Sequence, residues 1–521
     1  MNDLTIFDGL RLLKNKSYEA VHARSIALIK DDVENPLPYF LLGIIAEEHK
    51  NYGKAPELFA KAAELGPDVA HYQVYYAKIL STVGQQNAAK VSADKAVKLA
   101  INEAPLADAI GVVYSRAGYH ELAIPFFRQA VALDPKQANF HYNLAASAQF
   151  VGDFKTAKSA YVRTVELDNE HFRAWASLTS LEKQTVGENR LPKLIALFEQ
   201  AEGDADGRLQ IGHAIAKTHE DMGEHGESLK WLLKAKEAKR NQLRYDREAG
   251  QALFAAAKRT FGPDSMSAVC AATNTPIFVV GLPRTGTTLV DRILSSHAEV
   301  VSAGELNVFA ELVKEAANTS SNMVMDAETF QKAAEMDLSN IGASYIENTL
   351  DRAHGSRNMV DKMPLNFFYA GLIHRALPNA RIISLRRGAM DSCLSNVRQL
   401  FSTRHSYYNY TFDLEDTAEF YRSFDALMMH WRNVLPADRF MEVHYEDIVF
   451  DQEAQTRKLL DFCGLEWDEA CLRFHENAAP VSTASSVQVR QPLYSGSIGR
   501  WKKYGDKLDV LKTALGDLTE T

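Results

Sequence analysis

Small and apolar residues in the first half of the chain recur with a period of 34 residues. The small residues stand at Gly43, Ala77, Gly111 and Ala145, at Ala55, Ala89, Ala123 and Ala157, at Ala62, Ala96 and Ala130, and at Gly84, Gly118 and Gly152. Large residues such as Phe59, Phe127 and Tyr161 are placed to fill the grooves beside them. This period is typical of helix–turn–helix repeats, because small residues let two helices cross closely and a glycine ends the first helix.

This pattern resembles the tetratricopeptide repeat family. Residues 36–171 carry four regular repeats, residues 2–35 and 172–203 carry weaker ones, and residues 207–242 form one more. Stacks of such repeats usually present a concave binding face. We therefore expect a protein or peptide partner, or the acceptor of a reaction, on that face. The alternative is that the stack serves only as a scaffold or a dimer surface.

The pattern changes near residue 260. The segment FGPDSMSAVCAATNTP has no helical period and is rich in turn-forming residues, which indicates a linker. After it, short apolar runs predict buried strands at 276–281, 380–385 and 441–446, and helical patterns follow them at 287–297, 389–401 and 451–463. Strands that alternate with helices predict a parallel sheet with helices on both faces.

Composition and charge narrow the functional classes. The chain has 521 residues, of which 46% are hydrophobic and 24% charged, as in an ordinary globular protein. Its net charge of −9 argues against broad binding to nucleic acid or to anionic membranes, although a local basic pocket remains compatible with it. The four cysteines form no Cys-x-x-Cys pair, so we expect no structural zinc. With no secretory signal pattern and no long apolar run, we expect a cytoplasmic protein without a membrane span.

The segment PIFVVGLPRTGTTLVDRIL, which begins at Pro276, has the features of an anion site. Gly281 and Gly286 permit unusual backbone angles, and the N–H groups at the start of the following helix favour an anion. Arg284 adds a permanent charge. Nucleotide hydrolases place a lysine after the second glycine to reach the β- and γ-phosphates. Thr287 stands there in this chain, so we expect an anion on a single 5′-phosphate rather than a triphosphate.

The loop Pro-Arg-Thr-Gly-Thr-Thr resembles the 5′-phosphosulfate loop of the sulfotransferases, whose donor is 3′-phosphoadenosine 5′-phosphosulfate (PAPS). The resemblance implies that the donor contacts Arg284, Thr285, Gly286, Thr287 and Thr288. A second segment, ARIISLRRGAMDSCLSNVRQLF, resembles the family's 3′-phosphate element, which implies the arginine role for Arg387 and the serine role for Ser395. Gly388 and Ala389 replace the Asp-Pro or Asn-Pro that often follows the family's arginine.

Three further segments resemble the tyrosylprotein branch of that family. In SAGELNVF, the resemblance implies that Glu305 is the catalytic base, with His297 as the competing candidate. In MVDKMPLN it implies that Lys362 contacts the transferring sulfonate. Near the end of the chain it implies a transition-state role for Ser485, and it places Arg500 near the 3′-phosphate, where the family has lysine. Tyr445 matches an aromatic residue near the adenine.

These observations predict an all-α tetratricopeptide repeat solenoid followed by an α/β, P-loop-like sulfotransferase domain with a central parallel sheet. The expected boundaries are 1–262 for the solenoid, 263–275 for the linker and 276–521 for the sulfotransferase domain. The resemblance to the sulfotransferases covers about 275–505, and fusion of tetratricopeptide repeats to this domain is a known bacterial arrangement. It implies transfer of a sulfonate from PAPS to a hydroxyl acceptor such as a protein tyrosine. It implies PAP as the product and no metal.

Two other functions remain as alternatives. A nucleotide-dependent kinase or hydrolase is the nearest enzymatic one, but the missing loop lysine and the lack of an obvious magnesium aspartate argue against it. A non-catalytic repeat adaptor with a PAP-binding or relic second half is the other. A relic is expected to have lost Glu305, Lys362 or Arg387, and all three are present.

Overall fold

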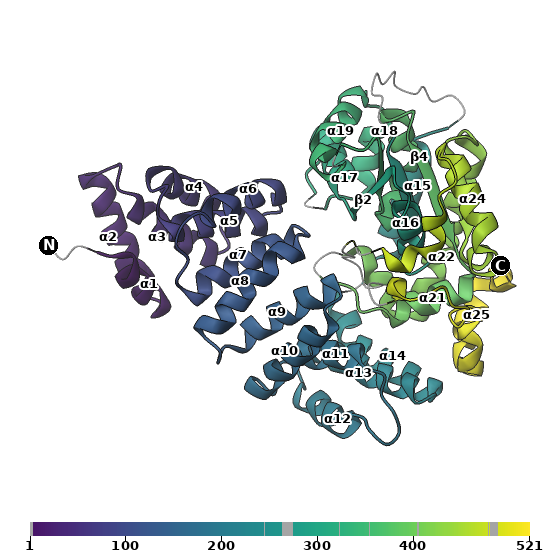
Figure 1. Cartoon of the computed structure of the whole chain (residues 1–521), viewed down its shortest axis with the longest axis horizontal. Helices are drawn as coiled ribbons and strands as arrows, with labels where there is room; N and C mark the ends of the chain where they lie inside the picture. The colour runs from purple at the N-terminus through teal and green to yellow at the C-terminus, as the bar shows by residue number, and fades with distance from the viewer. Residues whose placement is uncertain are drawn as a thin grey trace. The chain divides into compact units, whose positions relative to one another are not determined.

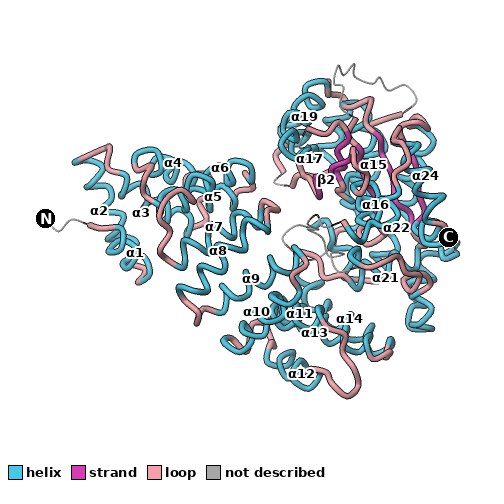
Figure 2. The backbone as a smooth tube through the Cα atoms, in the orientation of Figure 1, coloured by secondary structure: helices cyan, strands magenta, loops and turns pink. Residues whose placement is uncertain are grey.

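The computed structural model divides into two compact units, Met1–Ala174 and Trp175–Thr521. The structure describes residues 4–243, 245–262, 275–321, 323–353, 355–403, 406–477, 479 and 488–520. Of the predicted linker, residues 263–274 lie outside these ranges. Figure 2 shows helices alone in the first unit and the strands gathered in the second.

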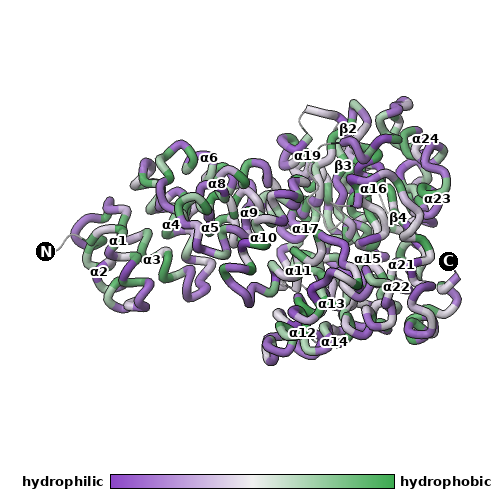
Figure 3. The backbone as a smooth tube through the Cα atoms, turned by 60° about the horizontal axis from the view of Figure 1, so that its bottom comes forward, coloured by the Kyte–Doolittle hydropathy of each residue, from purple (hydrophilic) through white to green (hydrophobic). Residues whose placement is uncertain are grey.

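The first unit consists of consecutive helix pairs (Figure 1). Its helices are α1 (Ile6–Lys14), α2 (Tyr18–Asp31), α3 (Pro36–Glu48), α4 (Ala55–Leu65), α5 (Ala70–Thr82), α6 (Gln86–Ala96), α7 (Ala104–Arg116), α8 (His120–Leu133), α9 (Ala138–Val151) and α10 (Phe154–Leu167). Hydrophobic and hydrophilic residues alternate along these helices in Figure 3, as expected when one face of each helix packs on its neighbours. The predicted helical repeats are confirmed.

The glycines of the 34-residue pattern have the predicted roles. Gly84, Gly118 and Gly152 follow the first helix of their pairs with φ of 88°, 83° and 87°, a left-handed conformation that glycine adopts without strain. Gly111 lies where two helices cross: a Cβ atom there would be 2.6 Å from the ring of Phe127, which is buried. The close packing of these two helices therefore requires both the glycine at position 111 and the large ring of Phe127.

Five more helices follow, and four of them lie within the second unit. They are α11 (Phe172–Leu181), which crosses the boundary between the units, and α12 (Leu191–Gln200), α13 (Ala205–Asp221), α14 (His225–Leu243) and α15 (Arg247–Arg259). On α15, the Phe254 ring lies 4.7 Å from the ring of Phe368 and 5.1 Å from that of Phe420. The compact unit that holds the sheet begins at Trp175, and of these helices α14 and α15 contribute to its core, through residues such as Leu229 and Phe254. The boundary at 262 stays a prediction.

The second unit is built on a five-stranded sheet in the order β2-β3-β1-β4-β5. Every pairing is parallel, and the strands are β1 (Ile277–Gly281), β2 (Val300–Gly304), β3 (Asn358–Asp361), β4 (Arg381–Arg386) and β5 (Phe440–His444). The predicted parallel sheet is confirmed. The sequence did not predict β2 or β3, and β5 ends at His444 because Tyr445 already begins a helix.

Helices cover both faces of the sheet, because alternate residues of β1 enter different cores. Phe278 and Val280 join one hydrophobic cluster, whereas Ile277 and Val279 join another. On the first face lie α17 (Val308–Ala317), α18 (Ala327–Ala334), α19 (Ser339–Ala353), α20 (Ala370–Ala376), α22 (Leu414–Val434) and α25 (Asp509–Leu515). On the second lie α16 (Thr287–Ser295), α23 (Tyr445–Phe450) and α24 (Gln452–Cys463).

The remaining elements are short. Helix α21 (Ala389–Arg398) follows β4, and 3-10 turns occupy Pro364–Tyr369, Ser406–Phe412, Glu469–Glu476, Gln488–Arg490, Arg500–Leu508 and Gly516–Glu520. Over the described residues, no helix combines the length and the apolar character that crossing a membrane requires.

The close crossing at Gly111 gives a prediction. Gly111→Ala should destabilise the first unit by roughly 1–3 kcal/mol, because the added methyl group overpacks the contact with Phe127. The measurement is amide hydrogen exchange of the full chain, with faster exchange expected in peptides from α7 and α8. As a control, Gly226→Ala on α14 enters open space, and the better helix propensity of alanine should leave it neutral or stabilising by up to about 1 kcal/mol. Equal exchange in both variants would contradict the proposed crossing.

Candidate functional site

The parallel sheet brings most of the predicted site residues to one edge. Because all five strands run the same way, their carboxyl ends lie together. Each strand leads directly into a predicted position: β1 into the loop 282–286, β2 into Glu305, β3 into Lys362, β4 into Arg387 and β5 into Tyr445. In the strand order, Glu305 and Lys362 follow the strands on one side of β1, and Arg387 and Tyr445 follow those on the other.

The loop after β1 is shaped by two glycines. At Gly281, φ is 146° and a Cβ atom would lie 2.7 Å from the carbonyl oxygen of Leu385. At Gly286, φ is 112° and a Cβ atom would lie 2.7 Å from the ring of Tyr445. Gly286 is also the N-cap of α16, so the first N–H groups of that helix open onto the loop. At both positions a side chain would be strained and crowded, so the loop, called the cradle below, keeps a backbone shape that is suited to an anion.

The threonines of the loop are buried, and one of them holds the turn closed. The hydroxyl of Thr285 donates to the carbonyl oxygen of Leu282 at 2.6 Å, whereas Thr287 and Thr288 begin α16. Asn396 of α21 donates its side-chain amide to the carbonyl of Pro283 at 2.9 Å, and accepts from the buried hydroxyl of Tyr410. The cradle is therefore attached to the helix that follows β4.

Arg284 is held at the centre of a positive cluster. Its backbone has φ of 67°, and its Nη2 donates to Oε1 of Gln488 at 3.0 Å. Burial, together with the nearby charges of Arg398, Arg387 and Arg500, lowers the pKa of Arg284 to about 10. Burial is the largest cause of this shift and the three neighbouring arginines add to it, so an anion bound at this position would stabilise the charged guanidinium.

Arg387 faces the cradle, whereas its neighbour Arg386 does not. Arg387 donates to the carbonyl of Arg284 at 3.1 Å, to that of Ser497 at 2.5 Å and, in a long contact of 3.5 Å, to the hydroxyl of Ser395. Its Nε is buried and has no hydrogen-bond partner among the described residues. Arg386 instead forms ion pairs with two carboxylates, those of Asp425 and Glu442.

The partners of Arg387 in these contacts are neutral oxygens, and no carboxylate within the described part of the chain forms an ion pair with it, in contrast to Arg386. The ring of Tyr445 lies 4.9 Å from its guanidinium carbon, a cation–π contact that orients the arginine. The Tyr445 hydroxyl makes a hydrogen bond of 2.6 Å with Ser497. A buried arginine without a counter-ion is a physical reason to assign an anion site to this position.

Glu305 and Lys362 form an ion pair on the other side of the cradle. Nζ of Lys362 contacts Oε1 of Glu305, and the backbone N–H of Lys362 donates to the carbonyl of Gly304 at 2.9 Å. The lysine side chain is 1% exposed and the glutamate side chain 38% exposed. The carboxylate can therefore meet a substrate from solvent, while the ammonium lies beneath it.

The competing base candidate, His297, is engaged elsewhere. It follows α16, and its Nε2 lies 3.0 Å from the carbonyl oxygen of Glu466 while its Nδ1 accepts the backbone N–H of Glu299 at 3.1 Å. This pattern places the ring proton on Nε2, which donates to the carbonyl. Both ring nitrogens of the buried imidazole therefore have backbone partners.

Arg500 and a second arginine meet at a carboxylate that sequence reasoning missed. Nε and Nη2 of Arg500 donate to Oε1 of Glu220 at 3.0 and 2.7 Å, and Arg398 forms an ion pair with Oε2 of the same residue. Arg398 had a signal in the sequence, because it lies three residues after Ser395 and so shares its face of α21. Glu220 had none, because it lies in a helix of the repeat pattern.

The segment that carries Arg500 is tied to α21. Asp391 accepts the backbone N–H groups of Gly499 at 2.6 Å and Trp501 at 3.0 Å. Ser485 lies outside the described residues.

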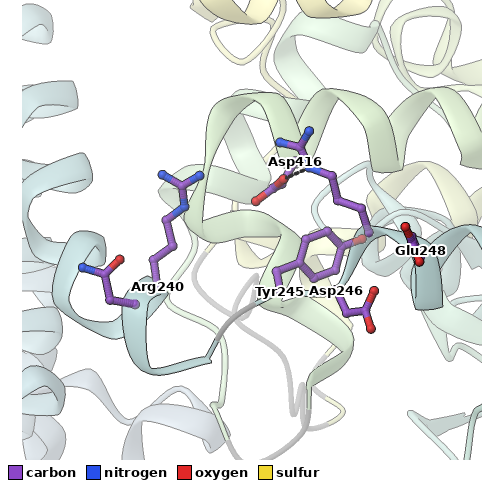
Figure 4. A pocket seen from close by; sticks show the side chains of 7 residues that line it. Arg240, Tyr245, Asp246, Glu248 and Asp416 are labelled. Carbon is purple, nitrogen blue, oxygen red and sulfur yellow. Dashed lines mark hydrogen bonds and ion pairs between the residues drawn. The ribbon is translucent and has the colours of Figure 1, made fainter.

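A large polar hollow of about 940 Å³ lies elsewhere in the second unit (Figure 4). It is lined by Arg240, Asn241, Tyr245, Asp246, Arg247, Glu248 and Asp416. Arg247 pairs with Asp416 at 2.5 Å, and Arg240 pairs with Asp413 at 3.0 Å. Since these two arginines have carboxylate partners and no predicted site residue lines the hollow, it is not the candidate site.

Comparison with known proteins identifies two families in the chain. Residues 276–469 match the sulfotransferase family, and residues 104–137 match a tetratricopeptide repeat. The chain therefore contains a sulfotransferase-family domain and tetratricopeptide repeats, which confirms both resemblances.

Curated relatives agree with these matches. An uncharacterized protein of Aquifex aeolicus (strain VF5) is 27% identical over 73% of this chain and 51% of its own length. The protein-tyrosine sulfotransferase of Drosophila melanogaster is 23% identical over 43% of this chain and 46% of its own length. Protein-tyrosine sulfotransferase 1 of Danio rerio is 25% identical over 43% of this chain and 65% of its own length. The chain thus spans about half to two thirds of the length of these relatives.

Two solved structures are also similar in part. The sulfotransferase domain from the curacin biosynthetic pathway is 17% identical and covers 47% of this chain and 98% of its own, with a TM-score of 0.32. YrrB, a TPR protein with an unusual peptide-binding site, is 17% identical and covers 40% of this chain and 96% of its own, with a TM-score of 0.29.

The anchoring of the Arg500 segment by Asp391 can be tested. Asp391→Ala should speed amide exchange in peptides that contain Gly499 and Trp501, because both N–H groups lose their acceptor. Exchange in β1 and β4 should stay unchanged. The matched control is Asp506→Ala, an exposed carboxylate in the same C-terminal stretch. If Asp391→Ala leaves exchange at Gly499 and Trp501 as in the wild type, Asp391 is not the anchor.

Proposed function

We propose that this protein transfers a sulfonate group from PAPS to a hydroxyl acceptor and releases PAP. One observation carries the proposal: the ends of five parallel strands bring an anion cradle, an arginine without a counter-ion, and a glutamate–lysine pair to a single edge of the sheet. The sulfotransferase family match over residues 276–469 supports the same reaction class.

The donor needs two anion sites, and two are available. The cradle from Arg284 to Thr288 suits the 5′-phosphosulfate, because helix N–H groups and a guanidinium converge there. On the β4 side, Arg387, Ser395 and Arg500 suit the 3′-phosphate. Tyr445, which already stacks on Arg387, offers an aromatic face for the adenine. The crowding of positive charge around Arg284 supports a ligand with several negative charges.

The reaction assigned to the site moves the sulfonate group from the 5′-phosphate oxygen of the donor to the acceptor oxygen. The acceptor oxygen forms a bond to sulfur, the bond from sulfur to the 5′-phosphate oxygen breaks, and Glu305 takes the acceptor's proton. The leaving phosphate gains negative charge, which Arg284, Lys362 and the N–H groups of the cradle stabilise. Ser485 is assigned a hydrogen bond to the same group. No metal is needed in this scheme, because the arginines and the lysine supply the positive field.

The acceptor is proposed from the chemistry and the relatives together. A carboxylate base that is 38% exposed suits a hydroxyl that approaches from solvent. Similarity to protein-tyrosine sulfotransferases favours a tyrosine of a protein or peptide. Tetratricopeptide repeats indicate protein–protein interaction, so we assign the recruitment of this substrate, or of another partner, to the repeats of the first unit.

The decisive experiment is transfer of labelled sulfonate from PAPS. The full chain is incubated with PAPS and with a tyrosine peptide library, and mass spectrometry then identifies the sulfated species. Sulfate esters that form only when both protein and PAPS are present would support the proposal. The absence of PAP binding by calorimetry would overturn it, and stabilisation by ATP–magnesium alone would favour the kinase alternative.

Two separate anion sites predict two separate losses of donor affinity. Arg284→Ala and Arg387→Ala should each weaken PAP binding by roughly 1.5–3 kcal/mol, the range for a lost charge-assisted hydrogen bond. Isothermal titration calorimetry measures this directly. Arg457→Ala is the matched control, because Arg457 is an exposed arginine of α24 that pairs with Glu453 on its own helix. Unchanged PAP affinity in both site variants would reject the donor assignment.

The choice of base predicts a contrast between two variants. With saturating PAPS, Glu305→Gln should keep donor affinity and lose about 100-fold or more in kcat, because general-base catalysis contributes on the order of 10²–10⁴. His297→Ala should leave kcat within a few-fold of the wild type, because its ring nitrogens already have backbone partners. The opposite result would transfer the role of base to His297.

A further inference from the structure

Glu220 makes an unusually complete set of contacts for a carboxylate in a helix of the repeat pattern. It lies near the end of α13, and Oε1 accepts Nε and Nη2 of Arg500 at 3.0 and 2.7 Å and the hydroxyl of Tyr504 at 2.8 Å. Oε2 pairs with Nη2 of Arg398. Both oxygens are thus used by groups from two other parts of the second unit, α21 and the C-terminal segment.

Only an ionised Glu220 offsets part of the repulsion between the two arginines, and it leaves the cluster with a net positive charge. Burial raises the pKa of Glu220, but the charges of Arg398 and Arg500, with the hydrogen bond from Tyr504, lower it overall. Two guanidinium groups that meet at one buried point repel each other strongly unless an anion lies between them. Glu220 therefore fixes where Arg398 and Arg500 can stand.

Arg398 and Arg500 both lie next to residues that are assigned to the candidate donor site. Arg398 shares a face of α21 with Ser395, and Arg500 follows Gly499, whose N–H is held by Asp391 of the same helix. Their charges both act on Arg284 of the cradle. They also lie closer to solvent than the carboxylate: the side chains of Arg500 and Arg398 are 31% and 21% exposed, against 6% for Glu220.

This difference in burial bears on whether Glu220 holds the two arginines for a ligand phosphate or competes with that phosphate for them. Arg500 uses its Nε–Nη2 edge for Glu220, so Nη1 takes no part in that contact. A guanidinium has five N–H donors and can bind two anions on different edges. Glu220 therefore contacts the arginines from the protein interior, and a ligand phosphate can bind them from the solvent side.

We propose that Glu220 is a positioning residue that holds Arg398 and Arg500 for the 3′-phosphate of the donor, so that helix α13 forms the rear wall of the donor site. This inference rests on the proposed function, because it assumes that the donor carries a 3′-phosphate. It assigns to a helix of the repeat pattern a direct part in donor recognition.

The test compares two ligands that differ in one phosphate group. In the full chain, Glu220→Gln should weaken binding of PAP by about tenfold or more, because both arginines lose their counter-ion and their fixed position. Binding of adenosine 5′-monophosphate, which lacks the 3′-phosphate, should change less than about twofold. With PAPS as substrate, KM should rise while kcat at saturation stays within a few-fold. Glu220→Asp, which keeps the charge, should recover part of the PAP affinity.

Two further variants complete the experiment. Glu227→Gln, an exposed carboxylate of α14, is the control and should bind PAP as the wild type does. Tyr504→Phe removes one hydrogen bond to Glu220 without changing any charge, and should weaken PAP binding by about two- to tenfold. This variant decides the question if Glu220→Gln does not fold.

Each outcome has one meaning. If Glu220→Gln or Tyr504→Phe binds PAP as tightly as the wild type, Glu220 does not position the arginines. If Glu220→Gln binds PAP more tightly, Glu220 competes with the donor, and the proposal is overturned. Equal losses for PAP and adenosine 5′-monophosphate overturn the assignment to the 3′-phosphate. If the wild type itself binds no PAP, the proposed function fails, which calorimetry of the wild type shows independently.

Discussion

The parallel direction of all five strands is the constraint on which the rest of the site depends. An anion cradle, a carboxylate and several cations are far apart in the sequence, and only the common edge of a parallel sheet gives them one location. The strand order then separates two tasks. The strands on one side of β1 lead to the glutamate–lysine pair, and those on the other lead to arginines and an aromatic ring. The two sides of β1 therefore differ in their electrostatic surroundings, and in the proposed reaction one side would serve proton transfer and the other donor binding.

Charge compensation explains which arginines are available to a ligand. Arg386 and Arg387 are neighbours in the sequence, yet alternation along the strand end sends one to carboxylates and the other to carbonyl oxygens. A buried cation that faces only neutral dipoles is costly, and an anionic ligand reduces that cost. The same reasoning applies to Arg284, whose crowded surroundings favour a multiply charged partner. Burial of these guanidinium groups opposes folding, and for the same reason it favours the binding of an anion that offsets their charge.

Local patterns in the sequence predicted the features that depend on neighbouring residues. The 34-residue period, the glycines at positive φ and the β1–loop–α16 segment are all of this kind, and the structure contains them. The strands β2 and β3 were missed, because VVSAG and NMVD are short and mix polar residues with apolar ones. The cluster of Glu220 with Arg398 and Arg500 could not be predicted, because its members lie up to 280 residues apart in the chain. Tertiary packing, rather than any motif, brings them together.

The shared core between the repeat-pattern helices and the sheet limits how the chain can be divided. Leu229, Phe254 and Phe261 lie in the same hydrophobic cluster as Phe278 and Val280 of β1. Lys236 of α14 donates to the carbonyl of Thr411, which lies in the 3-10 turn Ser406–Phe412 that precedes α22. A fragment cut at the predicted linker would expose this apolar surface to water and leave these polar groups unpaired. The part of the chain after the predicted linker therefore lacks several residues of the core around its own sheet. Among the described residues, the core around the sheet begins at Leu229, so a division of the chain that keeps this core whole must fall before that residue.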